Sequence, residues 1–333
     1  MSDLTTPTAA TNGGADENGE ALESDDEALK VLMDGDIDKV MSGLDRIVEA
    51  APSYEKLFAR WQRQHWSTED FDFTEDARQW ADPDMFTDEV RQFLAFGFSE
   101  FFIAEDRVTV ELLPFAIAAP QKEAQLFLTT QISDEAKHVV FWDRFYREVF
   151  NSDAEGIAEQ LNQHRYVVNK DWETMFDGIL HECAEDLRKD PSDFPALVRG
   201  VTVYMIVIEG MLALTAARFM IKALKENGWF PGFVQGFTAV NRDESRHVGF
   251  GVKFLADAIK ADRKNADIVV ETLKECLPVA PLVFVPPWVD DPYDFETPFY
   301  HSSEIFEYAT KSLSKKLAAM GLDPAMLGEP ATV

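Results

Sequence analysis

The amino-acid sequence predicts an all-α protein, on three observations. Apolar residues recur through most of the chain at the three- and four-residue spacing of an amphipathic helix. No stretch of useful length alternates apolar and polar residues as a half-buried strand does. The chain also has neither an internal repeat nor a Gly-rich phosphate loop. We therefore expect a bundle of long helices.

The helical spacing places the elements in order along the chain. One helix is expected within Asp25–Ala50 and another over Tyr54–His65, followed by an irregular stretch to Phe73 in which Ser67 or Asp72 could cap a helix. Five long helices are predicted next, over Thr87–Ala118, Gln121–Phe150, Ala154–Lys189, Asp193–Asn227 and Pro231–Lys260. Pro114 could bend the first of these, and Gly228 ends the fourth. A shorter helix to Cys276, an ordered loop over Leu277–Pro298 and a last helix over Ser302–Met320 follow.

Composition divides the chain into three parts. Residues 1–27 are polar and acidic with almost no large apolar side chains, so we expect a disordered acidic tail. Residues 28–320 are expected to form a single helical-bundle domain, because a bundle of long helices can reach this size undivided. Residues 321–333 are expected to be a flexible C-terminal tail.

Charge and cysteine content exclude several classes of protein. The formal net charge of -29 repels nucleic acid phosphate, so a nucleic acid-binding function is not expected. Such an acid excess fits a halophile with a high-salt cytoplasm, although an ordinary acidic protein could carry it too. We expect no membrane span and no secretory signal. With only Cys183 and Cys276, we expect no disulfide framework and a cytoplasmic location.

Two copies of the pattern Glu-x-x-His give the clearest chemical signal. They are Glu135-Ala-Lys-His138 and Glu244-Ser-Arg-His247. Residues three apart on a helix lie on one face, so each pair can present a carboxylate oxygen and an imidazole nitrogen to the same ion. Each motif alone is a weak signal, because a surface glutamate beside a core histidine gives the same pattern.

A lone glutamate precedes each motif within a strongly apolar helix. Glu105 lies 30 residues before Glu135, and Glu209 lies 35 residues before Glu244. A carboxylate buried on an apolar face is costly unless a cation compensates its charge. One helix, a turn and part of an antiparallel return would bring each lone glutamate level with its motif. The order Glu, Glu-x-x-His, Glu, Glu-x-x-His is typical of bundles that hold two iron or two manganese ions.

This set of ligands predicts O2 chemistry. Six ligands divided between two ions leave positions open for O2 or water, and hard carboxylates stabilise oxidised metal ions. Structural zinc sites instead use closed sets of cysteine and histidine. Asp243, directly before Glu244, could accept an imidazole N–H and hold that ring in one tautomer, or it could be a surface acid.

At these residues the chain resembles the ribonucleotide reductase small-subunit superfamily, over about Tyr54–Lys260. The resemblance implies a ferritin-like bundle with a dinuclear metal site. It also implies that a tryptophan connects through an aspartate to a metal-ligand histidine, and the matching residues are Trp66, Asp243 and His138. Without the resemblance, Trp66 would be interpreted as a core aromatic residue.

Ordinary reductase small subunits match the chain less well than one other branch. The resemblance implies a radical tyrosine seven residues after the second glutamate, where this chain has Trp142, and a C-terminal tail with a relay tyrosine, whereas Gly321–Val333 has no aromatic residue. The ligand-binding oxidase branch implies a manganese–iron centre, a long-chain fatty acid in a tunnel, and an ether cross-link between a valine and a tyrosine. The matching positions are Val108 and Tyr204.

The resulting hypothesis is an O2-activating oxidase, a homodimer with two metal ions per chain, manganese and iron or two irons, that takes a long apolar ligand such as a fatty acid. Carboxylate and imidazole suit both metals. The stretches Phe93–Phe102 and Met205–Met220 could line a tunnel or be plain core. A second hypothesis is a ribonucleoside-diphosphate reductase small subunit with the large subunit as partner. A third is a non-catalytic iron-binding bundle, which the extra helices disfavour.

Overall fold

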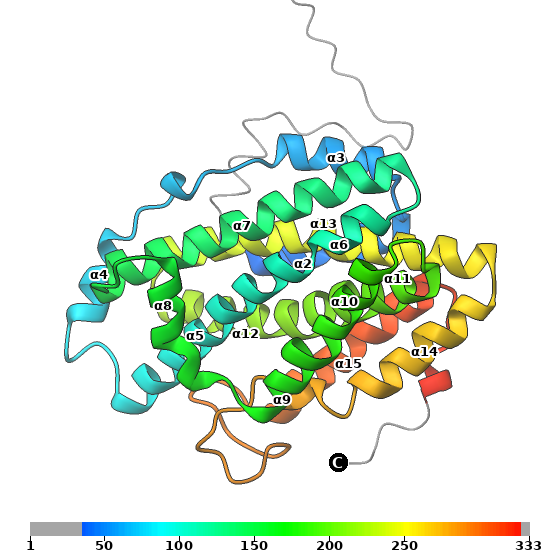
Figure 1. Cartoon of the computed structure of the whole chain (residues 1–333). Coiled ribbons are helices and arrows are strands. Elements are labelled where there is room, and N and C mark those ends of the chain that lie inside the picture. Colours follow the sequence, from blue (N-terminus) through cyan, green and yellow to red (C-terminus); the bar gives the residue numbers. More distant parts are fainter. Residues whose placement is uncertain (1–34, 328–333) are drawn as a thin grey trace, which may run out of the picture.

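The computed structural model describes residues 35–327, and most of these are helical (Figure 1). No β-strand occurs within this part of the chain, whose one β-pairing is an isolated bridge between Glu296 and His301. The all-α prediction is therefore confirmed. The expected acidic tail at residues 1–27 and the end of the expected C-terminal tail, residues 328–333, lie outside the described residues.

Turns and loops connect the helical elements, and the longest loop lies between Leu282 and Ser302. In chain order these are α2 Ile37–Ala50, α3 Tyr54–Arg63, η1 Thr68–Asp70, α4 Thr74–Ala81, α5 Asp88–Glu111, α6 Leu113–Ala118, α7 Lys122–Phe150, α8 Ile157–His164, η2 Arg165–Val167, α9 Lys170–Trp172, η3 Glu173–Leu180, α10 His181–Lys189, α11 Phe194–Val201, η4 Thr202–Ala213, α12 Leu214–Asn227, α13 Pro231–Ala261, α14 Lys264–Cys276, η5 Ala280–Leu282, α15 Ser302–Ala319 and η6 Pro324–Leu327.

Four long segments form the centre of the bundle. Helix α7 packs against α5 and α13, and α13 packs against η4 and its continuation α12. Nearly every side chain of α13 between Gly232 and Val252 is buried, including polar ones. A helix that is buried all round belongs to the core of a large protein. These four segments carry all the predicted metal ligands, so the ligands lie in the interior.

Side-chain caps explain where several helices begin. Asp36, Ser53, Thr87 and Asp193 each accept the backbone N–H of the third residue that follows. This bond satisfies one of the amide groups that the first turn of a helix leaves without a partner. Gly228, with φ of 69°, ends α12 in the left-handed conformation, as predicted.

The structure differs from the predicted elements at three main places, two of them boundaries and one a helix that was not predicted. The helix expected over Thr87–Ala118 ends at Glu111, because Pro114 lacks a backbone N–H and starts the separate helix α6. The helix expected over Ala154–Lys189 breaks near Val168, where Asn169 caps a new helical segment.

The third difference is α4, a helix over Thr74–Ala81 that was not predicted. The two side chains that it buries, Asp76 and Gln79, are polar, so the helix has no apolar periodicity. Asp76 accepts the N–H groups of Gly232 and Phe233 at the start of α13, at 2.9 and 2.6 Å. The contact between α4 and α13 is therefore made by hydrogen bonds, which satisfy amide groups at the start of α13 that have no partner within that helix.

The segment that carries Tyr204 and Glu209 is the π-helix η4. Such segments are rare and occur frequently at functional sites. A Cβ at Gly210 would lie 2.9 Å from Lys316 Cε, so α15 packs closely against this segment.

Within the described residues, one helical stretch is long and apolar enough to cross a membrane. It covers Phe194–Asn227, and 89% of its most apolar window is buried inside the protein. The sequence analysis expected no such stretch. Burial of this extent is typical of the core helix of a bundle.

Candidate metal centre

Four helical segments bring the six predicted ligands together in the core. Glu105 lies on α5 and Glu209 on η4, while the two Glu-x-x-His motifs lie on α7 and α13. All six side chains are buried, and the most exposed of them, Glu105, keeps only 8% of its surface accessible.

The donor atoms of these residues form two overlapping sets. The first set consists of Glu105, Glu135, His138 and Glu244, and the second of Glu135, Glu209, Glu244 and His247. Within each set the donor atoms lie within 4.8 Å of one another. Glu135 and Glu244 belong to both sets, so the arrangement suits a dinuclear site with two shared carboxylates.

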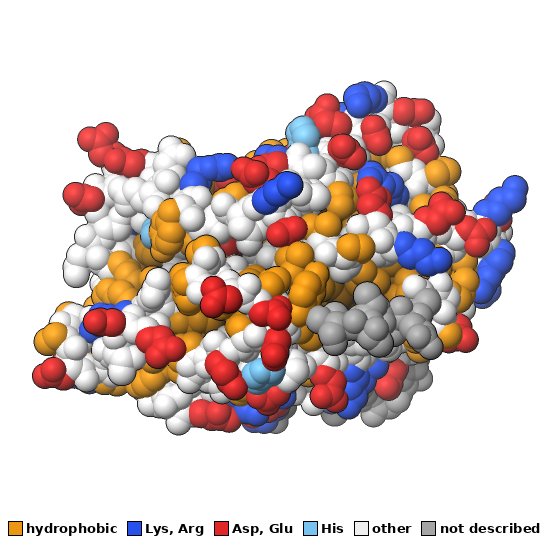
Figure 2. All heavy atoms as spheres, turned by 90° about the horizontal axis from the view of Figure 1, so that it is seen from below, with side chains coloured by type: hydrophobic (Ala, Val, Ile, Leu, Met, Phe, Trp, Pro, Cys, Tyr) orange, Lys and Arg blue, Asp and Glu red, His pale blue; other side chains and the backbone are white. Residues whose placement is uncertain are grey.

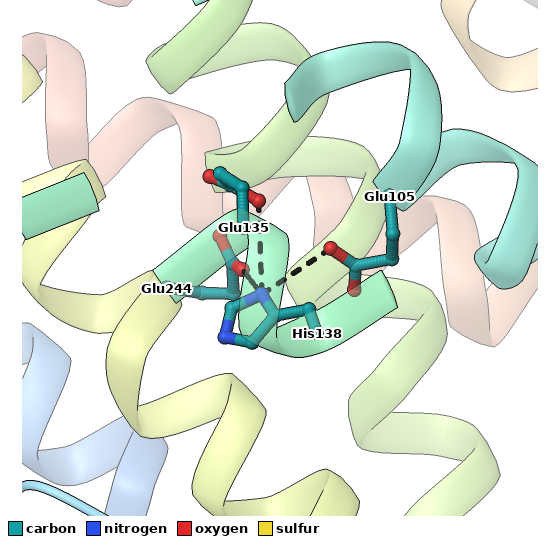
Figure 3. A group of neighbouring side chains, drawn as sticks. All are labelled: Glu105, Glu135, His138 and Glu244. Atoms are coloured by element: carbon teal, nitrogen blue, oxygen red, sulfur yellow. Dashed lines mark hydrogen bonds and ion pairs between the residues drawn. The ribbon is translucent and has the colours of Figure 1, made fainter. Parts of the chain in front are cut away.

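Each histidine turns its Nδ1 atom toward the carboxylates. His138 Nδ1 lies 3.3 Å from Glu105, 3.2 Å from Glu244 and 3.6 Å from Glu135 (Figure 3). His247 Nδ1 lies in the same way 3.4 Å from Glu135, 3.5 Å from Glu209 and 3.3 Å from Glu244. One imidazole therefore serves each set.

The opposite ring nitrogen of each histidine meets an aspartate from the other motif. His138 Nε2 lies 3.3 Å from Asp243, and His247 Nε2 lies 3.3 Å from Asp134. A carboxylate in this position accepts the Nε2–H and leaves Nδ1 free to bind a metal. Sequence analysis found Asp243 and missed Asp134. The signal was present, because both motifs share the pattern Asp-Glu-small-basic-His.

Two basic side chains, the buried Arg246 and the partly exposed Lys137, bridge these aspartates. Lys137 Nζ lies 3.1 Å from Asp134 and 2.9 Å from Asp243. Arg246 bonds the same two carboxylates at 3.0 and 2.5 Å. Burial works to raise the pKa of Asp134, but the hydrogen bond with His247 and the charges of Arg246 and Lys137 hold it below the usual value. Both aspartates thus stay ionised and accept hydrogen bonds from the histidines.

A tryptophan completes the surroundings of each aspartate. Trp66 Nε1 donates to Asp243 at 2.8 Å, and its ring stacks on His138 with centroids 6.2 Å apart. Trp66, Asp243 and His138 thus lie in the order that the resemblance implies. Trp61 Nε1 donates to Asp134 at 3.0 Å in the equivalent place. Sequence analysis did not single out Trp61, which is one of several aromatic residues on α3.

The carboxylates of the cluster require positive charge. Burial, and then the charge of Glu244, raise the pKa of Glu209 well above its usual value, and burial raises that of Glu105 to about 7. Burial works to lower the pKa of His138, but the charge of Glu105 and the hydrogen bond with Asp243 raise it well above its usual value. Four buried carboxylates so close together cannot all ionise unless cations balance them. The residues therefore fit two metal ions.

Unsatisfied oxygens support the same conclusion. Glu135 Oε2 and Glu209 Oε2 are buried and have no hydrogen-bond partner within the described part of the chain. Buried polar atoms nearly always have one, and a metal ion would satisfy both. Gln131 donates to Glu209 Oε1 at 2.8 Å. Sequence analysis missed Gln131, although its position one turn before Glu135 places it on the ligand face of α7.

The two predicted cross-link residues border these carboxylates. Val108 is buried and lines a small hollow of about 30 Å³ together with carboxylates of both sets. Tyr204 is fully buried, and its hydroxyl donates to Glu135 Oε1 at 3.2 Å. Trp142, at the position where the resemblance implies a radical tyrosine, is also fully buried and stacks on Phe101 with centroids 6.1 Å apart.

A much larger apolar cavity lies beside the small hollow. Its volume is about 1400 Å³, and its walls come from α5, the end of η4, α12, α15 and the loop between α14 and α15. Phe101 and Phe284 line both spaces, and their rings stack with centroids 5.8 Å apart. Figure 2 shows the face that carries this loop, with hydrophobic side chains gathered in a band around a hollow. Both stretches suggested as tunnel walls contribute to its lining, among others with Phe93, Phe96 and Phe101 from the first and Met211, Phe219 and Met220 from the second.

Known proteins share this sequence pattern and this fold. Residues 50–279 match the family described as ribonucleotide reductase, small chain. The chain is also similar to solved structures of R2-like ligand-binding oxidases. One, a tyrosine-to-phenylalanine mutant with an aerobically reconstituted Mn/Fe cofactor, is 26% identical over 82% of this chain and 94% of its own, with a TM-score of 0.68. Another, a glycine-to-phenylalanine mutant with the same cofactor, is 26% identical over 82% and 98%, with a TM-score of 0.69.

The match confirms the predicted fold class, a ferritin-like helical bundle of the reductase small-subunit type with a site suited to two metals. It also makes the protein an oxidoreductase at the general level. The family model covers more than half of the chain, and the residues that it spans include all six buried ligands. The chain belongs to the ribonucleotide reductase small-chain family.

Proposed function

We propose that this protein is a dinuclear-metal oxidase that activates O2 and holds a long-chain fatty acid. The observation that carries the proposal is the pair of overlapping buried donor sets, each with one histidine and both with Glu135 and Glu244. The likeness to oxidases solved with an Mn/Fe cofactor favours manganese and iron over two irons. Such a pair of ions supplies the electrons that reduce O2.

The six ligands can be assigned to two metal ions. Glu105 and His138 would bind one ion, Glu209 and His247 the other, and Glu135 and Glu244 both. Asp243 and Asp134 would fix the two imidazole rings by accepting their Nε2–H groups.

The environment of the site keeps water out. Phe101, Val108 and Phe237 line the small hollow beside the carboxylates, and each is at most 5% exposed. A dry, apolar pocket limits side reactions of an oxidising centre with water.

Val108 and Tyr204 are proposed to form an ether bond near the metals. The bond joins Val108 Cβ to the Tyr204 oxygen, and one hydrogen atom leaves each residue. This is a two-electron oxidation, for which O2 is the oxidant. Both side chains border the same carboxylates, and Tyr204 already contacts Glu135 through its hydroxyl group.

The size and lining of the large cavity support the proposal that the ligand is long and apolar. Its volume of about 1400 Å³ exceeds the ~300–1,000 Å³ of common small-ligand pockets, and most of its lining is apolar. The fatty acid would place its tail there. A homodimer is also proposed, and sedimentation of the metal-loaded protein would test it.

The family match is also consistent with one alternative function, that of the reductase small subunit that generates a radical for deoxyribonucleotide synthesis. Trp142 disfavours it, because a tryptophan cannot form the tyrosyl radical that the resemblance implies at this position.

Metal analysis and intact mass together test the proposal. Metal-free protein is loaded with manganese and iron, in air and without air. We expect two metal ions per chain in both samples, and a mass about 2 Da lower only after exposure to air, since the ether bond removes two hydrogen atoms. Fewer than two bound ions would refute the dinuclear site. Two ions with no change of mass in air would refute the cross-link and favour the reductase alternative.

A further inference from the structure

Two buried polar side chains in the large cavity have no hydrogen-bond partner. Glu100 is 1% exposed, and neither of its carboxyl oxygens meets a partner within the described residues. The hydroxyl group of Thr215, 3% exposed, is also without one. Because buried polar groups nearly always have a partner, these two indicate a partner from outside the chain.

The other charged residues of the cavity lining are Lys274, Asp291 and Asp294, and all three are exposed to solvent. They therefore belong to the mouth of the cavity. Glu100 is the one charged-type residue of this lining that is buried. A carboxyl group deep in an apolar space recognises a polar group on the ligand, because it adds nothing to apolar packing.

Glu100 and Thr215 lie at a similar level on two facing helices. Helix α5 touches α12 at Gly97, where an added Cβ would lie 2.7 Å from Met220 Cε. Both helices run from this contact to the metal cluster, at Glu105 on α5 and Glu209 on η4. Glu100 and Thr215 are therefore both between the contact and the cluster.

One face of α5 connects the large cavity with the cluster. Residues 93, 94, 96, 97, 100 and 101 line the cavity, and residues 101, 104, 105 and 108 line the small hollow. Alternating steps of three and four residues follow a single helical face. A chain-like ligand that starts at the metals and follows this face passes Glu100.

The surroundings of Glu100 determine its protonation. Burial raises the pKa of its carboxyl group to about 9. At neutral pH the group therefore carries its proton and can donate a hydrogen bond. The Thr215 hydroxyl can donate or accept. An uncharged oxygen suits both groups, whereas an amine would require the ionised carboxylate.

We infer that Glu100 and Thr215 bind an uncharged oxygen, a hydroxyl or a carbonyl, carried part-way along the aliphatic chain of the ligand. The inference makes Glu100 a residue that determines specificity. It rests on the proposed function in one respect, that the head of the ligand lies at the metal cluster.

Calorimetric titration tests the inference on metal-loaded protein freed of lipid. Octadecanoic acid is compared with isomers that carry one hydroxyl in the middle of the chain. We expect at least one isomer to bind about tenfold more tightly, as the two hydrogen bonds allow. Glu100→Leu should abolish this preference while octadecanoic acid binds as tightly or more tightly. Thr215→Val, which keeps the shape of the side chain, should reduce the preference severalfold.

Thr272→Val is the matched control. Thr272 is a buried threonine on α14 whose hydroxyl donates to Ile268 O at 2.7 Å, and it does not line the cavity. This variant should keep the full preference. No preferred isomer with the wild type, or a preference that survives in Glu100→Leu, would overturn the inference. Tighter binding of the analogue that carries an amino group at the preferred mid-chain position than of the hydroxyl isomer itself would overturn it too, because it would show an ionised Glu100.

Metal content, measured on the same samples, separates this inference from the proposed function. Two ions per chain with no selectivity would refute the inference alone. Selectivity that depends on Glu100 in a chain unable to hold two ions would support the inference and refute the dinuclear oxidase.

Discussion

Replacing Glu100 with glutamine should change how the stability of the protein depends on pH. Burial raises the pKa of this carboxyl from 4.5 to about 9. Between these values the unfolded chain releases the proton while the folded protein keeps it. The folded state then binds more protons than the unfolded state, so the free energy of unfolding falls as pH rises, by about 1.4 kcal/mol per pH unit. The contribution of Glu100 is fully present below pH 4.5 and is lost as pH rises toward the folded pKa.

From pH 4.5 to neutral pH, this loss amounts to about 3 kcal/mol. Glu100→Gln has nearly the same shape and no titrating group. The difference in free energy of unfolding, variant minus wild type, should therefore grow by about 3 kcal/mol between about pH 5 and pH 7.5. The metal ligands titrate in both proteins, so their effect cancels in the difference.

Denaturant unfolding at a series of pH values, followed by circular dichroism, measures this difference. Glu123→Gln, at an exposed glutamate on α7, is the control and should differ from wild type by no more than about 0.5 kcal/mol at each pH. Equal pH dependence of Glu100→Gln and wild type would refute the reasoning, because it would mean that Glu100 is hydrated or paired in the folded protein.

Four further outcomes are expected. Glu135→Ala should lose bound metal, measured by elemental analysis, without unfolding, because helix packing supplies most of the stability; two retained ions would contradict the assignment. Tyr204→Phe should keep both metals and lose the mass change of about 2 Da that air produces, since no hydroxyl remains to bond Val108. Asp134→Asn should weaken metal binding about 10–100-fold, since it disturbs the orientation of a ligand imidazole; an unchanged affinity would exclude that role. Mixing the protein with the organism's reductase large subunit should yield no deoxyribonucleotide, and product that disappears on deletion of Gly321–Val333 would favour the reductase alternative.

The ligand set could be predicted from the sequence because helical spacing is a local property. Glu135 and His138 are three residues apart, so any α-helix places them on one face. Glu105 and Glu209 were identifiable because burying a carboxylate on a strongly apolar helix is costly unless a cation compensates its charge. The break at Pro114 and the cap at Asn169 follow from local chemistry too, but they compete with an apolar pattern that continues across them.

The contacts around the ligands could not be predicted in the same way. The position of Asp134 was visible, but its contact with His247, 113 residues away, depends on the packing of α7 against α13. The large cavity depends on where α15 and the loop before it pack, which no local pattern specifies. Nor could the sequence show that Glu100 lacks a partner, because this depends on every element around it.

The crossed contacts between the two motifs relate the metal positions by an approximate twofold symmetry. Glutamate, histidine, aspartate, basic residue and tryptophan all occur twice, and each aspartate serves the histidine of the opposite helix. Identical surroundings cannot prefer different elements at two positions. Any sorting of manganese from iron must then come from the side chains without a counterpart. Gln131 is one of these, because its amide donates to Glu209 Oε1 at 2.8 Å, whereas the matching position four residues before Glu244 holds Val240, which has no side-chain donor. The amide of a single glutamine thus makes one half of the centre different from the other.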